Sequence, residues 1–247
     1  MTHSVMVFTV ITVLAVILAG CKGTVNPAPS AIDLEYDFGK GKQGWEHGFA
    51  EYSPVMEIDK DGAIKPLPEE LGIDGTGYYV QSMNRSDDVF MFLKRHIGAD
   101  EGIVPGQTYR LIYNITFASN APSGAVGIGG APGESVFFKA GGSAQEPKVV
   151  LEDDYYVMNV DKGGGNSGEG PAATIAGDVA NGIPAEEAFE KPELPYASVE
   201  IEHEHTYTVT ATEDGDLWLL VGTDSGFEGL TGLYYQNISV TLEPVDE

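Results

Sequence analysis

The sequence of 247 residues is poor in cysteine and in basic side chains. Cys21 is the only cysteine, so the chain cannot form an internal disulfide. It contains 13 lysines and arginines against 38 aspartates and glutamates, which gives a formal net charge of −25. Because so acidic a chain repels a phosphate backbone, we expect no nucleic-acid partner.

Long amphipathic helical patterns are also missing, and alternation of apolar and polar residues recurs instead. The clearest example is a strand predicted at residues 107–119, between two turn signals. Residues 90–93 are apolar at every position, which predicts a strand covered on both faces. The apolar side chains that share one face of the first strand are Tyr109, Leu111, Tyr113, Ile115 and Phe117.

Turns rich in glycine, proline and aspartate separate many such strands, and the chain contains 32 glycines. The pattern predicts an all-β fold, a jelly-roll-like β-sandwich of two mainly antiparallel sheets. We expect turns at 59–62 and 213–216, the second closing a hairpin, and one long glycine-rich loop at 162–196. That loop is predicted to hold a short strand at 173–179 and a helical turn at 185–189. Other strands are expected at 32–38, 78–83, 89–97, 135–140, 148–151, 155–160, 198–212, 217–221 and 233–242.

The first 21 residues have an apolar core that ends in small residues, a pattern typical of a cleaved signal peptide. The tetrad Leu18-Ala19-Gly20-Cys21 resembles the bacterial lipobox. The resemblance implies that Cys21 is acylated and becomes the first residue of a membrane-anchored lipoprotein on the extracytoplasmic side of the cell envelope. Residues 1–20 would then be the signal peptide, 21–31 a lipidated tether, and 32–247 a single β-sandwich domain. The sequence does not tell which membrane holds the lipid.

The two ends of the domain resemble those of galactose-binding-like jelly rolls in extracellular carbohydrate-binding modules. The likeness rests on Tyr36-Asp37-Phe38-Gly39 followed by Gln43-Gly44-Trp45, and on the strand at 233–240. In those modules the first and last strands lie close together, and an acidic side chain from each end often helps hold a structural calcium. The resemblance implies Asp37 and Asn237 as calcium ligands, with Asn237 standing where an aspartate is more usual.

Carbohydrate sites combine aromatic rings with carboxylates and amides, because rings stack on the apolar face of a sugar. Tyr155 and Tyr156, beside the glycine-rich loop, are candidate ligand-binding residues. Asp224 and Glu228 belong to the polar loop 222–229, which is either part of a site or an ordinary turn between strands.

A second candidate site lies on the strand at 198–212, where Glu200, Glu202 and Glu204 share one face. The run is similar to the catalytic strand of jelly-roll endoglucanases. That likeness implies Glu200 as nucleophile, Glu202 as an orienting carboxylate and Glu204 as acid/base. The alternative is a solvated acidic face, opposite the apolar residues of the strand.

His203 and His205 occupy the other face of this strand at a spacing that a metal site permits. The alternative is a pair of neutral, hydrogen-bonded histidines, since the sequence identifies no third ligand.

Three functions follow from the sequence. The first is a noncatalytic envelope lipoprotein whose ectodomain binds a ligand, with a glycan as the leading candidate. The second is a jelly-roll glycoside hydrolase that uses Glu200 and Glu204, and the third is a structural or adhesive envelope protein. Calcium is the only cofactor that the sequence suggests.

Overall fold

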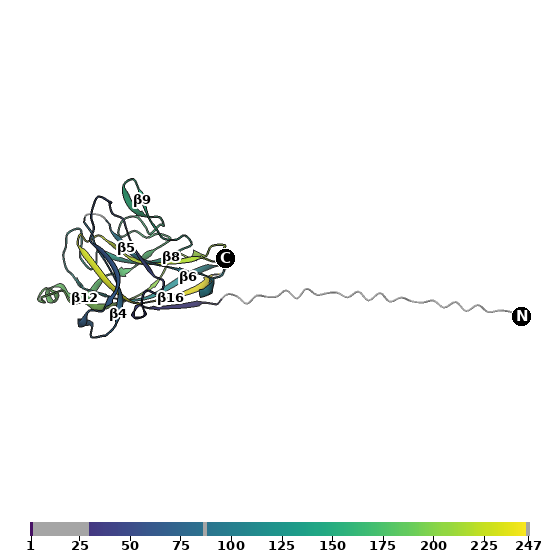
Figure 1. Ribbon diagram of the computed structural model, residues 1–247, viewed down its shortest axis with the longest axis horizontal. Coiled ribbons are helices and arrows are strands. Elements are labelled where there is room, and N and C mark those ends of the chain that lie inside the picture. The colour runs from purple at the N-terminus through teal and green to yellow at the C-terminus, as the bar shows by residue number, and fades with distance from the viewer. Residues whose placement is uncertain (2–29, 86–87, 246–247) are drawn as a thin grey trace.

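The protein is a β-sandwich, seen in a computed structural model that describes Met1 and residues 30–85 and 88–245 (Figure 1). Two large antiparallel sheets face each other, which confirms the predicted all-β, jelly-roll-like fold. Cys21, the predicted signal peptide and nearly all of the tether lie outside the described residues. Within the described ones, no helix has the length and apolar character needed to cross a bilayer.

Sheet A has seven strands, in which β13, β6, β16, β4 and β3 follow one another, β1 pairs with β16 and β14 pairs with β6. Sheet B has five strands in the order β11, β8, β15, β5 and β2. Sheet A contains β1 (Ile32–Asp37), β3 (Lys60–Pro66), β4 (Thr76–Met83), β6 (Thr108–Ser119), β13 (Ala197–Glu204), β14 (Val209–Thr210) and β16 (Leu230–Val245). Sheet B contains β2 (Glu46–Ala50), β5 (Phe90–Ile97), β8 (Val136–Ser143), β11 (Thr174–Asp178) and β15 (Leu217–Ser225).

The main core lies between the two sheets and follows from the alternation in the sequence. In β6 the predicted inward positions are buried, while Arg110 and Asn114 on the alternate positions are exposed. The inward side chains of β5 and β15, such as Leu93 and Val221, meet those of β6 and β16 in one apolar cluster. Burial of this kind, at about 25 cal/mol per Å² of apolar surface, is the main stabilising contribution.

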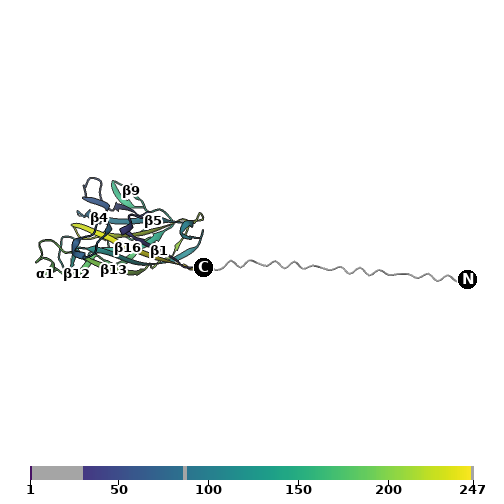
Figure 2. The same cartoon turned by 60° about the horizontal axis from the view of Figure 1, so that its bottom comes forward.

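A second, smaller core lies on the outer face of sheet B. Phe90, Phe92 and Leu220 point away from the main core. Residues 146–173, which we call the excursion, pass over this face, and Met158 and Val160 of the excursion pack on the three side chains. Strand β5 is therefore covered on both faces, as its uninterrupted apolar run predicts. The excursion carries the hairpin of β9 (Val149–Glu152) and β10 (Tyr155–Met158), which stands out from the sandwich (Figures 1 and 2).

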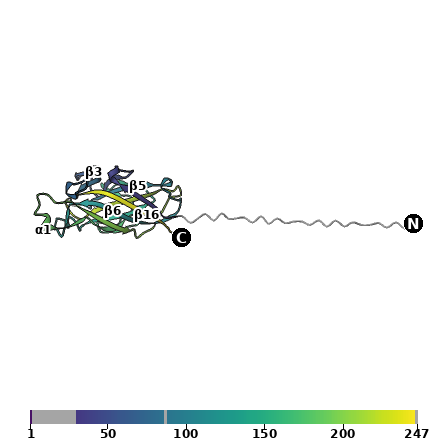
Figure 3. The same ribbon diagram turned by 90° about the horizontal axis from the view of Figure 1, so that it is seen from below.

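The predicted long loop contains both elements that were expected in it. The predicted short strand appears as β11, and the helical turn as α1 (Ala185–Ala188). The loop also holds β12 (Ala180–Pro184), which pairs in parallel with β7 (Ala121–Ser123). Figure 3 shows α1 at the end of the sandwich away from the C-terminus.

The turn predicted at 213–216 is present, but the hairpin expected there and the turn expected at 59–62 were wrong. The turn at 213–216 does not close a hairpin, because β14 pairs with β6 in sheet A whereas β15 pairs with β5 and β8 in sheet B. The turn carries the chain from one sheet to the other, with Gly215 at φ 83°. Residues 60–62, predicted as part of a turn, begin β3, where Lys60 pairs with Ser82 of β4.

Candidate functional site

The three glutamates of β13 face the solvent. Strand β13 is at the edge of sheet A, and Ile201 points into the core, so the alternate positions point outward. Glu204 lies 3.3 Å from the Arg110 guanidinium at the surface. Glu200, Glu202 and Glu204 line none of the cavities described below. A retaining hydrolase needs two carboxyl groups about 5–5.5 Å apart around a bound sugar, with the pKa of one of them raised. An outward edge strand supplies no such enclosure, so the geometry favours the solvated acidic face.

Asp37 and Asn237 are brought together, as the resemblance implies. They are directly paired across β1 and β16. The Asp37 carboxylate accepts a hydrogen bond from Gly39 N at 2.8 Å and lies 3.3 Å from Lys40 Nζ. The described residues contain no cluster of three or more histidines, cysteines, aspartates and glutamates that would hold an ion. Calcium needs about six to eight oxygen ligands. Asp37 thus caps the turn that follows β1 and forms an ion pair with Lys40, and calcium binding by Asp37 and Asn237 stays a prediction.

Asp224 is not a surface ligand, which corrects the prediction for this residue. Its side chain is 0% exposed, and Oδ2 lies 2.8 Å from Lys139 Nζ and 2.7 Å from Lys162 Nζ. Lys139 comes from the neighbouring strand β8 and Lys162 from the excursion over sheet B. Burial raises the pKa of Asp224 and lowers that of Lys139, and the opposite charges offset both effects. This ion cluster fastens the excursion to the sheet.

The other three predicted ligand residues, Glu228, Tyr155 and Tyr156, differ in exposure. Glu228 is exposed, and its backbone N–H donates to Ile128 O at 2.8 Å. Tyr155 and Tyr156 are consecutive in β10, so their side chains leave opposite faces of the strand. Of the two, Tyr156 lines the cavity described next.

That cavity, of about 500 Å³, opens between the loop 51–59, the start of β3 and β10. Its aromatic side consists of Tyr52, which is 7% exposed, and the more exposed Tyr156, with ring centroids 5.0 Å apart. Lys60 Nζ donates to Tyr52 Oη at 2.6 Å. We call this the Tyr52–Tyr156 cavity. The remaining lining residues are Pro54, Met56, Glu57, Ile58, Asp59 and Arg85.

Backbone hydrogen bonds fix the two aromatic residues relative to each other. Tyr156 N donates to Tyr52 O at 2.9 Å, and Glu51 N donates to Tyr156 O at 2.6 Å. Glu51 has a positive φ of 61°, and its Oε1 accepts from Met158 N at 3.1 Å. Ile58 of the same loop and Val89 form a small buried cluster with Tyr52. The rings are therefore positioned before any ligand arrives, which lowers the entropy cost of binding.

A second group of tyrosines lies on the outer face of sheet A. Tyr79 and Tyr234 have ring centroids 4.6 Å apart, and Tyr196 meets Tyr234 edge-on at 5.4 Å. Lys65 Nζ lies 4.0 Å from the centroid of Tyr79. Burial raises the pKa of Tyr79 to about 12 and also raises the pKa of Tyr196 and Tyr234. These rings pack on one another on the surface of the sheet and border no cavity as large as the Tyr52–Tyr156 cavity.

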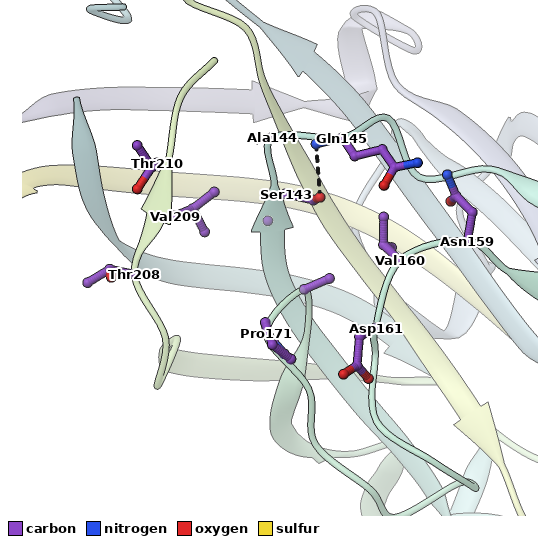
Figure 4. Close-up of a pocket in the computed structure, with 12 residues that line it drawn as sticks. Ser143, Ala144, Gln145, Asn159, Val160, Asp161, Pro171, Thr208, Val209 and Thr210 are labelled. Carbon is purple, nitrogen blue, oxygen red and sulfur yellow. Dashed lines mark hydrogen bonds between the residues drawn. The ribbon is translucent and has the colours of Figure 1, made fainter. Parts of the chain in front are cut away.

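Figure 4 shows a smaller pocket of about 290 Å³ between β8, the excursion and β14. Gln145 and Asn159 lie on one side of it, and Thr208 and Thr210 on the other. The Asn159 amide accepts from Lys148 N at 2.6 Å and donates to Glu146 O at 3.0 Å, so it already holds the loop in place. No aromatic ring lines this pocket. Its polar groups serve the local structure more than a ligand.

Strand β13 ends at Glu204, so the strand predicted at 198–212 is interrupted before β14. His203 in β13 and His205 just after it form a hydrogen-bonded chain through Thr174. His205 Nε2 lies 3.0 Å from Pro171 O, which only accepts, so Nε2 carries the proton and Nδ1 accepts from Thr174 Oγ1 at 2.9 Å. The Thr174 hydroxyl in turn accepts from His203 Nε2 at 2.8 Å. Burial lowers the pKa of both histidines. They are neutral links between β13 and residues 171–174, as the alternative to a metal site predicts.

No family model and no curated protein matches this sequence. Several solved structures that the chain resembles are carbohydrate-binding modules. A module specific for non-crystalline cellulose is 11% identical with 83% of this chain and 90% of that chain covered, at a TM-score of 0.35. A mannan-recognising module is 13% identical, with 86% and 98% covered and a TM-score of 0.34. A cleaved adhesin domain of Lys-gingipain from Porphyromonas gingivalis is 6% identical, with 84% and 96% covered and a TM-score of 0.36.

The chain spans only part of some larger proteins that it resembles. It covers 61% of a carbohydrate-binding-module structure to which it is 13% identical, and 20% of a bacteriophage tailspike protein. The TM-scores of these matches are both 0.34. Likenesses of this strength place the chain in none of these families, so a functional assignment rests on its own residues.

Sequence reasoning found one residue of the Tyr52–Tyr156 cavity and missed the rest. Tyr156 was singled out because it is a tyrosine beside acidic residues and a long loop. Tyr52 and Lys60 are about a hundred positions away, in a stretch between 38 and 78 where no strand was predicted. The isolated bridge between Tyr52 and Tyr156 joins segments that are far apart in the chain, so no local sequence pattern predicts it.

Proposed function

We propose that this chain is an extracytoplasmic lipoprotein, anchored through Cys21, whose β-sandwich binds a glycan without cleaving it. The anchor and the cellular location rest on the lipobox-like tetrad. The noncatalytic part of the proposal is supported by the outward orientation of Glu200, Glu202 and Glu204.

The observation that carries the glycan proposal is the Tyr52–Tyr156 cavity. A sugar presents apolar ring faces, which pack on aromatic side chains, and hydroxyl groups, which need donors and acceptors. Tyr156 offers aromatic surface, Lys60 and Arg85 are donors, and Asp59 is an acceptor at the same cavity. Its volume of about 500 Å³ is within the usual range for a small-ligand site.

A glycan array with the full chain in mild detergent, followed by calorimetry on each hit, tests the proposal. We expect Tyr156→Ala to weaken binding about three- to tenfold, the usual value of one aromatic contact. Tyr234→Ala, on the far face of sheet A, is the matched control and should leave affinity unchanged. If diverse polysaccharides all fail to bind, the glycan function is wrong and a structural or adhesive role takes its place. If Tyr234→Ala abolishes binding and Tyr156→Ala does not, the site has been assigned to the wrong surface of the sandwich.

Mass spectrometry of the native product tests the anchor separately. We expect a mature chain that begins at Cys21 and carries acyl groups, because two or more chains hold a protein stably at a bilayer. A product with Met1 still attached and an unmodified thiol would disprove the anchor and the location together, without affecting the binding experiment.

A further inference from the structure

An apolar cavity of about 380 Å³ lies at the α1 end of the sandwich, separate from the Tyr52–Tyr156 cavity. Phe189 and Leu194 border it from the segment after α1, Val126 and Pro132 from the loop before β8, and Leu230 from the start of β16. We call it the Phe189 cavity. Residue Ile32, where the sandwich begins, pairs with Leu242 at the far end of β16. Leu230 and Leu242 are twelve positions apart in β16, which is roughly 40 Å at about 3.3 Å per residue. The cavity therefore lies far from the point where the chain enters the sandwich.

The apolar surface extends beyond the cavity itself. Val126 is 94% exposed, Phe189 62% and Leu230 49%, and Ile128 on the same loop as Val126 is also exposed. These four are among only ten large apolar side chains that are exposed in the described part of the chain. Single exposed apolar residues are ordinary, but a contiguous exposed group indicates an interaction surface. A surface larger than its cavity indicates a macromolecular partner more than a small molecule.

The segments that build this cavity are strongly acidic. None of their glutamates lines the cavity itself, and we call the exposed glutamates of these segments its acidic rim. The segments 120–135, 185–194 and 226–232, which build the cavity, contain six glutamates and one lysine. All six glutamates are exposed, and they are Glu134, Glu186, Glu187, Glu190, Glu193 and Glu228. A second copy of the chain would bring the same glutamates and a net charge of −25 against this rim, so self-association is opposed by repulsion. The charge favours a cationic occupant.

We propose that the Phe189 cavity and its acidic rim dock a segment of a partner protein that carries apolar side chains flanked by lysines or arginines. An apolar anchor of the partner fills the cavity between Phe189 and Leu230. The flanking cations meet glutamates of the rim, such as Glu190 and Glu228. This site is independent of the proposed glycan function, since it uses different residues at a different place on the sandwich.

Calorimetry with three capped hexapeptides and the full chain tests the proposal. The first peptide is Leu-Phe with two lysines on each side, the second replaces Leu-Phe by Ser-Ser, and the third replaces the lysines by glutamates. We expect the first peptide to bind at least tenfold more tightly than either of the others, since each buried apolar side chain and each favourable charge contributes. Its affinity should fall as salt rises from about 0.05 to 0.5 M, because exposed charges are screened.

Variants of the chain locate the binding. Phe189→Ser and Leu230→Ser should each lower the affinity for the first peptide by about tenfold. The midpoint of thermal unfolding should change little, because both side chains are exposed. Val104→Ser, an exposed apolar position near the other end of the sandwich, is the matched control and should leave affinity unchanged.

The remaining outcomes overturn the proposal. Equal binding of the serine peptide would show charge attraction without an apolar anchor. Failure of all three peptides below about 1 mM would show that nothing of this chemistry docks there. Tight binding of neutral 3-phenylpropanol in the same cavity would make it a small-molecule site. Dimerisation in sedimentation experiments that Phe189→Ser abolishes would identify a second copy as the occupant.

Discussion

The outer faces of the two antiparallel sheets differ in how much of their surface is covered. On sheet A, outward positions such as Asn114 and Glu202 meet solvent. On sheet B, outward positions such as Phe92 and Leu220 are buried under the excursion of residues 146–173. The difference follows from the strand sequences: β6 and β13 alternate, whereas β5 is apolar at four consecutive positions, Phe90 to Leu93. A strand that is apolar on both faces must be buried on both faces, and here the excursion buries the outer face of sheet B.

The excursion also explains why charged side chains have different environments on the two sheets. Sheet A carries its glutamates in water, at small cost, while sheet B buries Asp224 and can do so only with Lys139 and Lys162 in contact with it. The buried cluster thus belongs to the attachment of the excursion and not to ligand recognition.

The largest expected effect comes from breaking this cluster. Asp224→Ala leaves two buried ammonium groups without their partner, so we expect the free energy of unfolding to fall by about 3–5 kcal/mol. Urea unfolding followed by fluorescence measures it. Glu204→Ala, which breaks an exposed pair with Arg110, is the matched control and should cost no more than about 1 kcal/mol. Similar losses in both variants would mean that the two outer faces do not differ as described.

A somewhat smaller effect is expected from truncating the second core. Leu220→Ala removes a fully buried side chain on the outer face of sheet B and should cost about 2–5 kcal/mol. Ile112→Ala, at a half-buried outward position of β6 in sheet A, should cost less. The same urea experiment gives both values. A larger loss at Ile112 would reverse the comparison of the two faces.

The hydrogen-bonded chain His203–Thr174–His205 links the end of β13 to the start of β11. It predicts that the stability of the fold depends on pH. Burial lowers the pKa of both histidines below their usual value of about 6.5, with Glu169 opposing the effect. As the pH falls below about 6.5, the unfolded chain therefore binds protons that the folded chain does not, and the free energy of unfolding decreases until the pH reaches the lowered pKa.

Thermal unfolding at about pH 7.5 and about pH 5.5 measures this effect. The midpoint should be lower at the acidic pH, and the drop should be smaller in the double variant His203→Gln/His205→Gln. An equal drop in that variant would assign the pH dependence to other groups.

The smallest effect is expected on the outer face of sheet A. Replacing Glu200, Glu202 and Glu204 together by glutamine should change stability by less than about 0.5 kcal/mol per site, because surface substitutions away from buried partners have little effect. Any glucanase activity of the chain should also be indifferent to Glu204→Gln. Loss of a measurable activity in that variant would revive the hydrolase hypothesis.

Most of the fold was predictable because it depends on local alternation. The strands β1, β4, β5, β6, β8 and β16 were all located within a few residues, and Phe90 to Leu93 were expected to be covered on both faces. The errors fall where pairing is not local. Lys60 was placed in a turn because Asp61-Gly62 has turn chemistry, yet pairing with β4 keeps it extended.

The candidate site was predictable only in part. Asp224 was assigned to ligand binding because aspartate in a polar loop is normally exposed, but Lys139 lies 85 positions away and Lys162 lies 62 positions away. Tyr156 was identified, while its partner Tyr52 was not, since the bridge between them joins two separate segments.

The sequence by itself determined the all-β class, the inward and outward positions along the strands, and the lack of any disulfide, because each depends on residue type and near neighbours. Only the tertiary structure decided which of the charged and aromatic side chains meet. Asp224 became a buried anchor, Tyr156 became part of a cavity, and the glutamates of β13 stayed in water. The physical reason is that burial and pairing depend on residues distant in the chain, whose contacts the local alternation does not specify.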